Sequence, residues 1–218
     1  MTRASMPLLR NPRLWLALLL LAVAALAVWW FFLRPEIIYR GPPIRVAHGM
    51  VEERELVLME SSDGEDRVAF LKRVGQVLVE HADRTGHEAC GQVCQNVDST
   101  RFAVQVVTND AHLMCAMWTT CPEGYLPTGT NIHTHCPSGR MLRANAADAL
   151  FSANRHRRNS TLPPCDDQTF SAQDYAAGPG YLATPDRLLY QAGRRQLQDL
   201  GPLQVIEASS IEAASAAP

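Results

Sequence analysis

Residues 14–33 form an unbroken run of twenty residues without a charged side chain, LWLALLLLAVAALAVWWFFL. At a rise of about 1.5 Å per residue, a helix of this length spans about 30 Å, the thickness of a bilayer core. Arg13 and Arg34 bracket the run, and a pair of tryptophans lies near its end, where aromatic side chains favour the membrane interface. The run therefore predicts a transmembrane anchor, with residues 1–13 on the cytoplasmic side.

A cleaved signal peptide is the alternative interpretation of this run. Its AVA and ALA tripeptides resemble cleavage sites, but a signal peptide normally has a shorter apolar region. Cleavage there would also leave a mature chain that starts with VWWFFL. The length of the run favours an uncleaved, single-pass anchor.

The cysteines indicate which side of the membrane holds the rest of the chain, because the arginines are nearly balanced across the run. All six cysteines follow it. An even set beyond an export-like segment favours disulfides and an oxidising compartment, whereas six reduced, buried thiols are the alternative. We therefore expect an inner-membrane anchor with a periplasmic or extracellular domain.

The remaining sequence fits one domain over residues 51–201. Residues 34–50 are rich in Pro, Gly and Arg, which is typical of a linker. Residues 202–218 are rich in Ala, Ser and Glu, which is typical of a loose tail. The net charge of −2 gives no indication of a nucleic-acid partner.

The order of helical and strand patterns in this domain is typical of an α+β fold. A helix is predicted over about Glu65–Arg84, with Ser62 or Asp63 as its cap and Gly86 as its stop. The predicted strands are Val51–Met59, Ala89–Gln95, Arg101–Thr108, Leu113–Thr119, Gly129–His135, Gly180–Thr184 and Leu188–Gln191, and the other predicted helices are Met141–Asn154 and Ser171–Ala177.

The sequence NIHTHCP places His133 and His135 two residues apart at the end of a predicted strand. Residues i and i+2 of a strand point to the same face, so both imidazoles can reach one metal ion at about 2.0–2.1 Å. An H-x-H pair also occurs by chance on surfaces. Because strand ends beside loops are where sites occur, this pair predicts a metal site.

A catalytic zinc ion takes three protein ligands and needs a carboxylate nearby to accept a proton from water. Glu88 follows the first predicted helix, and Ser171 and Asp174 form an S-x-x-D motif. Each has an ordinary alternative: Glu88 can be a surface charge, and S-x-x-D is commonly a helix capping box. Their order along the chain, together with the histidines, favours the functional interpretation.

A Glu before a Cys-Gly strand, then His-Thr-His, then Ser-x-x-Asp resembles the JAMM (JAB1/MPN/Mov34) zinc metalloprotease family over roughly residues 65–191. The resemblance implies a curved, mainly antiparallel sheet flanked by helices. It also implies a zinc-dependent peptidase or isopeptidase that hydrolyses an amide bond in a protein or peptide substrate, and the apolar run at residues 14–33 would anchor this enzyme to the membrane.

The resemblance also implies a role for each matching position. His133, His135 and Asp174 would bind zinc. Glu88 would accept a proton from the attacking water and pass it to the leaving amine. The hydroxyl of Ser171 would donate to the oxyanion that forms at the attacked carbonyl.

The chain departs from the family pattern after His135. Thirty-five residues, 136–170, separate His135 from Ser171, whereas a short run separates them in the family. The residue after the second histidine is usually Pro in the family, but here it is Cys136. We therefore expect an insertion at about residues 138–170.

The insertion leaves the third ligand open. Asp148 is closer to the family spacing, but Asn145 would then replace the serine, and Asp166 and Asp167 are further candidates. Asp174 is favoured because its S-x-x-D motif and the YLATP segment that follows fit the family together.

Disulfide pairing is constrained by Cys90 and Cys94, which are four residues apart on a predicted strand. They would lie roughly 13 Å apart, too far for a bond between them. If one strand holds both, at least one of the bridges predicted among the other cysteines must change. The predicted bridges span the insertion and a turn, as Cys136–Cys165 and Cys115–Cys121.

Other functional classes fit less well. A catalytically silent member of the same fold, acting as a binding or scaffold module, is the main alternative. Another metal hydrolase with an H-x-H strand would need more histidines downstream, where only His156 remains. A cysteine zinc site lacks a C-x-x-C pair.

Overall fold

The structure is a computed structural model that describes residues 15, 18–19, 21–23, 42–152 and 157–203. It divides into two units, residues 1–37 and 38–218. In the first unit, Trp15 and residues 18–19 and 21–23 are helical. The remainder of the predicted anchor, like residues 1–13 and most of the predicted tail, lies outside the described residues. The part of the chain that the structure describes contains no helix long and apolar enough to span a membrane.

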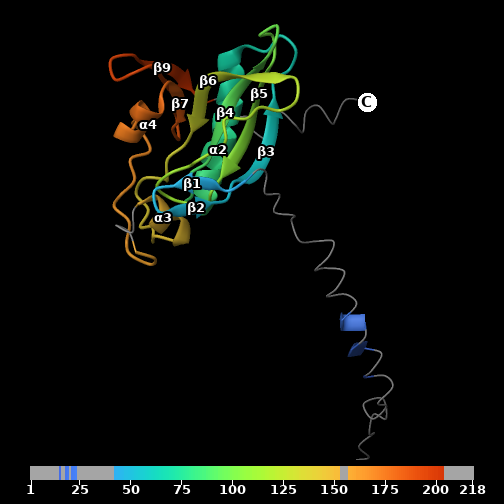
Figure 1. The fold of residues 1–218 in the computed structure, drawn as a ribbon, viewed down its shortest axis with the longest axis vertical. Coiled ribbons are helices and arrows are strands. Elements are labelled where there is room, and N and C mark those ends of the chain that lie inside the picture. The colour runs from blue at the N-terminus through green and yellow to red at the C-terminus, as the bar shows by residue number, and fades with distance from the viewer. Residues whose placement is uncertain (1–14, 16–17, 20, 24–41, 153–156, 204–218) are drawn as a thin grey trace, which may run out of the picture. The chain divides into compact units, whose positions relative to one another are not determined.

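The second unit has the α+β fold expected from the sequence, built on a mainly antiparallel seven-stranded sheet (Figure 1). Neighbouring strands follow the order β3-β5-β4-β6-β7-β8-β9, and β6 and β7 are the one parallel pair among them. The bounds are β3 Arg54–Glu60, β4 Cys90–Asn96, β5 Phe102–Thr108, β6 Tyr125–His133, β7 Gly180–Ala183, β8 Arg187–Gln191 and β9 Leu197–Pro202.

Helix α2, Arg67–Thr85, packs against strands β5, β6, β7 and β8 (Figure 1). Its fully buried side chains, with Phe70 and Leu78 among the largest, form the core with the facing side of the sheet. The carboxylate of Asp66 caps the helix by accepting from two backbone N–H groups, so the predicted cap at Ser62 or Asp63 was wrong. Gly86 ends the helix as predicted, with a positive φ of 81° that favours glycine.

The segment 113–119 is not a strand, contrary to the prediction, and runs as an irregular loop. Two of its backbone N–H groups donate to side chains instead of to a neighbouring strand: Ala116 N–H donates to Asn109, and Trp118 N–H donates to Glu53. A β-branched and aromatic pattern alone cannot exclude this arrangement, because it depends on acceptors distant in sequence.

In the described part of the insertion, residues 138–152 and 157–170, the helix is α3, Ala146–Phe151, which is shorter than the helix predicted over Met141–Asn154. Asn145 caps it, and the residues before the cap are extended, with Arg143 paired to Thr161 in an isolated bridge. A small hairpin within the predicted linker region packs against α3 and consists of β1 Ile44–Val46 and β2 Gly49–Val51. A second short helix, α4, Ala172–Ala177, precedes β7.

Two disulfides, Cys90–Cys115 and Cys94–Cys121, tie the loop after β5 to strand β4, and a third, Cys136–Cys165, spans the insertion; none of the six described cysteines is free. The predicted bridge across the insertion is confirmed. The predicted Cys115–Cys121 bridge was wrong, because β4 holds both Cys90 and Cys94, and each of them is bonded to a different cysteine of the loop between β5 and β6.

Candidate metal centre

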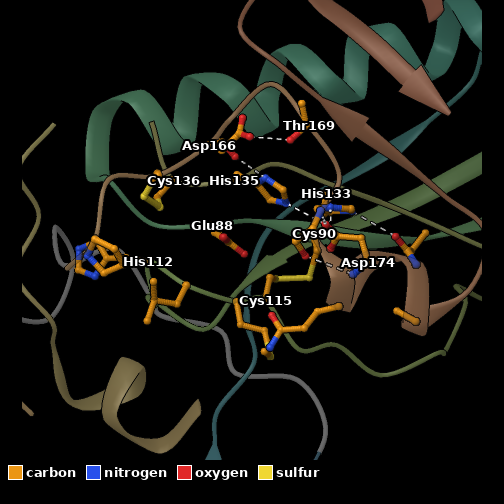
Figure 2. A pocket seen from close by; sticks show the side chains of 18 of the residues that line it. Glu88, Cys90, His112, Cys115, His133, His135, Cys136, Asp166, Thr169 and Asp174 are labelled. Atoms are coloured by element: carbon orange, nitrogen blue, oxygen red, sulfur yellow. Dashed lines mark hydrogen bonds and ion pairs between the residues drawn. A yellow bond between two sulfur atoms is a disulfide. The ribbon is translucent and has the colours of Figure 1, made fainter. Parts of the chain in front are cut away.

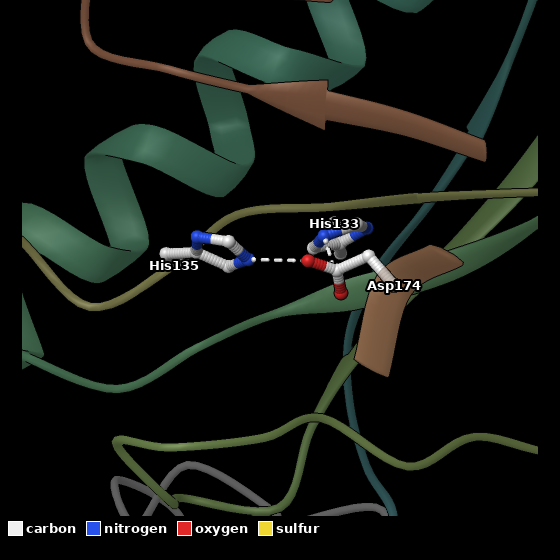
Figure 3. Close-up of side chains that lie close together, drawn as sticks. All are labelled: His133, His135 and Asp174. Atoms are coloured by element: carbon white, nitrogen blue, oxygen red, sulfur yellow. Dashed lines mark hydrogen bonds and ion pairs between the residues drawn. The ribbon is translucent and has the colours of Figure 1, made fainter. Parts of the chain in front are cut away.

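Strand β6 ends at His133, and the chain continues past its end to His135. Helix α4 brings Asp174 opposite both imidazoles (Figure 3). Nε2 of His133 lies 3.2 Å from Asp174 Oδ1, and Nε2 of His135 lies 3.2 Å from Asp174 Oδ2. One ligand atom from each of the three residues lies within 4.8 Å of the others, so the group can hold a metal ion.

Each imidazole is oriented by a contact at its other nitrogen. Nδ1 of His135 donates to the backbone carbonyl of Asp166 at 2.8 Å, and Nδ1 of His133 lies 3.3 Å from Asn131 Oδ1. Such partners fix the tautomer that leaves Nε2 free for a metal. Nε2 of His133 is buried and faces Asp174 Oδ1 at 3.2 Å without the geometry of a hydrogen bond, which fits two ligand atoms that face one ion.

Electrostatics also favour a positive charge at this point. Burial works to lower the pKa of His135, but the hydrogen bond to Asp174 and the charges of Glu88 and Asp174 raise it to about 9. Burial lowers the pKa of His133. Burial opposes ionisation of Asp174 too, yet the two imidazoles hold its pKa well below the usual range. The Asp174 carboxylate can therefore be stabilised either by a protonated imidazole or by a metal cation bound between the three residues.

The carboxylates of the other candidate third ligands accept hydrogen bonds from other groups. Asp148 is fully buried and accepts from the backbone N–H and from Nδ1 of His112, both at 2.7 Å. The carboxylate of Asp167 accepts from Ser138 N–H, and that of Asp166 accepts from Gln168 N–H and the Thr169 hydroxyl. Among the described candidates, Asp174 is the one that faces both histidines.

Glu88 lines the same cavity, which has a volume of about 460 Å³ (Figure 2). Its backbone is held on both sides, because its N–H donates to the carbonyl of Ala111 and its carbonyl accepts from the Thr108 hydroxyl. Burial raises the pKa of its carboxyl to about 8, against the opposing effect of His135. Glu88 is therefore not a surface charge but a buried carboxyl group beside the candidate metal ligands.

Ser171 caps helix α4 and also lines the cavity. Its hydroxyl oxygen accepts from Asp174 N–H at 3.3 Å, and its own N–H donates to Asp174 Oδ2 at 2.6 Å. The capping-box interpretation of S-x-x-D is therefore correct, and it is compatible with a role at the site. The cap leaves the hydroxyl proton available to a group in the cavity.

Three residues near the site were not singled out by sequence reasoning. Asn131 contacts His133 and could have been found by its i−2 position on the same strand face. Gln191 is buried on β8 and donates to the carbonyls of Asp174 and Gly178, which holds α4 in place. His112 lines the cavity beside Glu88, and no sequence signal distinguishes it from other histidines.

No protein-family model, curated protein or solved structure matches this chain in the comparisons. The likeness to a family therefore consists of the motif positions alone. The functional interpretation depends on how the fold arranges those positions.

Proposed function

We propose that this chain is a zinc-dependent peptidase of the JAMM type, in which a water molecule attacks an amide bond of a protein or peptide substrate. The observation that carries the proposal is the convergence of the motif residues. Three separate parts of the chain bring them to one cavity, with Glu88 before β4, the histidines at the end of β6 and the S-x-x-D motif at α4. The mainly antiparallel sheet with α2 against one face supports the same proposal.

Zinc suits this donor set. Two imidazole nitrogens and one carboxylate are common zinc ligands, and three protein ligands leave a position open, as catalytic sites require. When bound, zinc supplies Lewis acidity that polarises a carbonyl and makes water nucleophilic near neutral pH. His135 is buried and the side chain of His133 is 11% exposed, so both Nε2 atoms are largely shielded from bulk solvent and stay oriented toward the ion.

Two further residues of the chain supply the proton and the hydrogen bond that amide hydrolysis needs. The Glu88 carboxylate accepts a proton from the attacking water and delivers it to the leaving nitrogen. Its burial favours the protonated form that follows acceptance. The Ser171 hydroxyl donates to the oxygen of the attacked carbonyl. One such donor lowers the activation free energy by about 2.7–4 kcal/mol.

The cellular placement is part of the proposal. Three disulfides among the described residues suit an oxidising compartment, such as the periplasm or the outside of a cell. The apolar run at residues 14–33 would hold the domain at the membrane that borders this compartment.

Metal content and hydrolysis of the full-length chain test the proposal together. We expect one equivalent of zinc per chain and cleavage of a labelled, unfolded protein that a chelator abolishes and added zinc restores. The double variant His133→Ala, His135→Ala should lose both. A wild-type chain without zinc would rule out the enzyme, whereas bound zinc without cleavage would favour a silent binding module of the same fold.

A further inference from the structure

The cavity around the candidate metal centre has apolar walls from two separate segments of the chain. Leu113, Met114 and Met117 line it from the loop between β5 and β6. Pro163 and Pro164 line it from the insertion. Apolar walls around a few polar groups are typical of a site that binds apolar parts of a ligand.

Disulfides fasten both walls to the segments that carry the site. Cys115 lies between the two methionines and is bonded to Cys90, two residues after Glu88. Cys165 follows the prolines and is bonded to Cys136, which directly follows His135. The distance between the walls is therefore set before a ligand enters, so an extended segment can bind without the cost of ordering the loops.

The described lining residues of the cavity give neither chain terminus a dedicated charged partner. None of its described lining residues is Lys or Arg, so apart from the histidines of the candidate metal centre they offer no cation for a terminal carboxylate. Its carboxylates are engaged as well: Asp166 accepts from Thr169 and Gln168, and Asp174 faces the two histidines. The remaining carboxyl group, Glu88, is assigned to proton transfer, which leaves no carboxylate for a terminal ammonium.

We infer that the cavity takes an internal, extended stretch of polypeptide with uncharged, apolar side chains, so that the chain acts as an endopeptidase. The inference rests on the proposed function for the cleavage step. The binding step needs the walls and their charge alone, and it can be measured without turnover.

Binding is measured with the zinc-loaded, full-length Glu88→Gln variant and two labelled peptides of equal length. One is apolar and blocked at both ends. The other carries glutamates at its centre and a free carboxyl end. Fluorescence anisotropy should show at least about tenfold tighter binding of the blocked apolar peptide. Equal affinities, a preference for the acidic peptide, or binding of neither would overturn the inference.

A cation added to the wall should change this preference. Met117→Lys is expected to raise the affinity for the acidic peptide relative to the apolar one by about tenfold, because it supplies the missing positive charge. Leu113→Lys adds the same charge at a second position of this wall. The matched control is Met141→Lys, since Met141 is 84% exposed and does not line the cavity. An unchanged preference in both wall variants would show that this wall does not contact the peptide.

Cleavage by the wild-type chain separates this inference from the proposed function. Mass spectrometry of the products of an unfolded protein should show internal cuts beside apolar residues. Release of terminal residues alone would refute the inference and leave the peptidase in place. Selective binding of the apolar peptide without any cleavage would support the binding site and refute the peptidase.

Discussion

Helices α3 and α4 are each six residues long, and each begins with a capping box that ends in aspartate. In α3 the pair is Asn145 and Asp148, and in α4 it is Ser171 and Asp174. In both, the cap side chain accepts from the N–H of the aspartate, and the carboxylate accepts from the N–H of the cap. The two helix starts are therefore nearly identical in local structure.

The surroundings of the two carboxylates differ. Asp148 is fully buried and accepts from the backbone and the ring of His112, so it holds the insertion against the chain that follows β5. Asp174 is 17% exposed at its side chain and faces His133 and His135 across the cavity. A capping box directs a carboxylate back toward the helix start, but the group opposite decides whether it supports the fold or can hold a metal.

Metal binding gives the largest expected difference between the two aspartates. Asp174→Asn should lower zinc affinity by more than about a hundredfold, because loss of a direct ligand exceeds the 10–100-fold effect of removing an outer contact. Asp148→Asn should keep one equivalent of zinc. Equilibrium dialysis with elemental analysis measures both, and a zinc-free Asp148→Asn chain that is still folded would reverse the assignment.

Glu88 is expected to take part in catalysis together with the residues of α4. Glu88→Gln is expected to lower the rate of hydrolysis by about 10²–10⁴-fold while zinc stays bound, because glutamine cannot accept the proton. Glu53→Gln is a matched control, since Glu53 is also a buried glutamate with a raised pKa but does not line this cavity. Full activity in Glu88→Gln would exclude it as the base.

The two cap residues should separate a structural effect from a catalytic one. Ser171→Ala and Asn145→Ala should each lower the free energy of unfolding by about 1 kcal/mol, as loss of a helix cap usually does. Ser171→Ala should also lower kcat by about 10²–10³-fold, as expected for an oxyanion donor. Denaturant titration and steady-state kinetics measure the two effects, and similar kcat values for both variants would limit Ser171 to capping.

Substitution of Asp148 should affect stability and leave metal binding unchanged. Burial works to raise its pKa, but hydrogen bonds from His112 and from the Asn145 backbone lower it overall. The folded state therefore binds this proton more weakly than the unfolded chain, so the stabilisation is present above about pH 4 and lost as the pH falls through the folded pKa. Asp148→Asn should cost about 1–3 kcal/mol at pH 7 and flatten the decline in stability below about pH 4. Denaturant titrations over this pH range measure both; an unchanged acid decline would contradict the role.

Patterns local in the sequence predicted much of the fold and of the candidate site. The helix stop at Gly86 and the β7–β8 hairpin follow from backbone preferences, and the pairing of His133 with His135 at one site was predicted too, although β6 ends at His133 and not at His135 as expected. Strand β9 was missed, because its residues show no clear alternation and their exposure reflects an edge position in the sheet.

The sequence by itself determined the residue types available for a metal, their order and the covalent crosslink across the insertion. Only the tertiary structure decided whether Asp148 or Asp174 is the third candidate ligand, since the starts of their helices are alike. The choice depends on the histidine that each carboxylate faces, and that histidine lies many residues away in the sequence. It also decided the disulfide partners of Cys90 and Cys94. The extended strand β4 holds these two cysteines too far apart to bond to each other, so each bonds to a cysteine of the neighbouring loop.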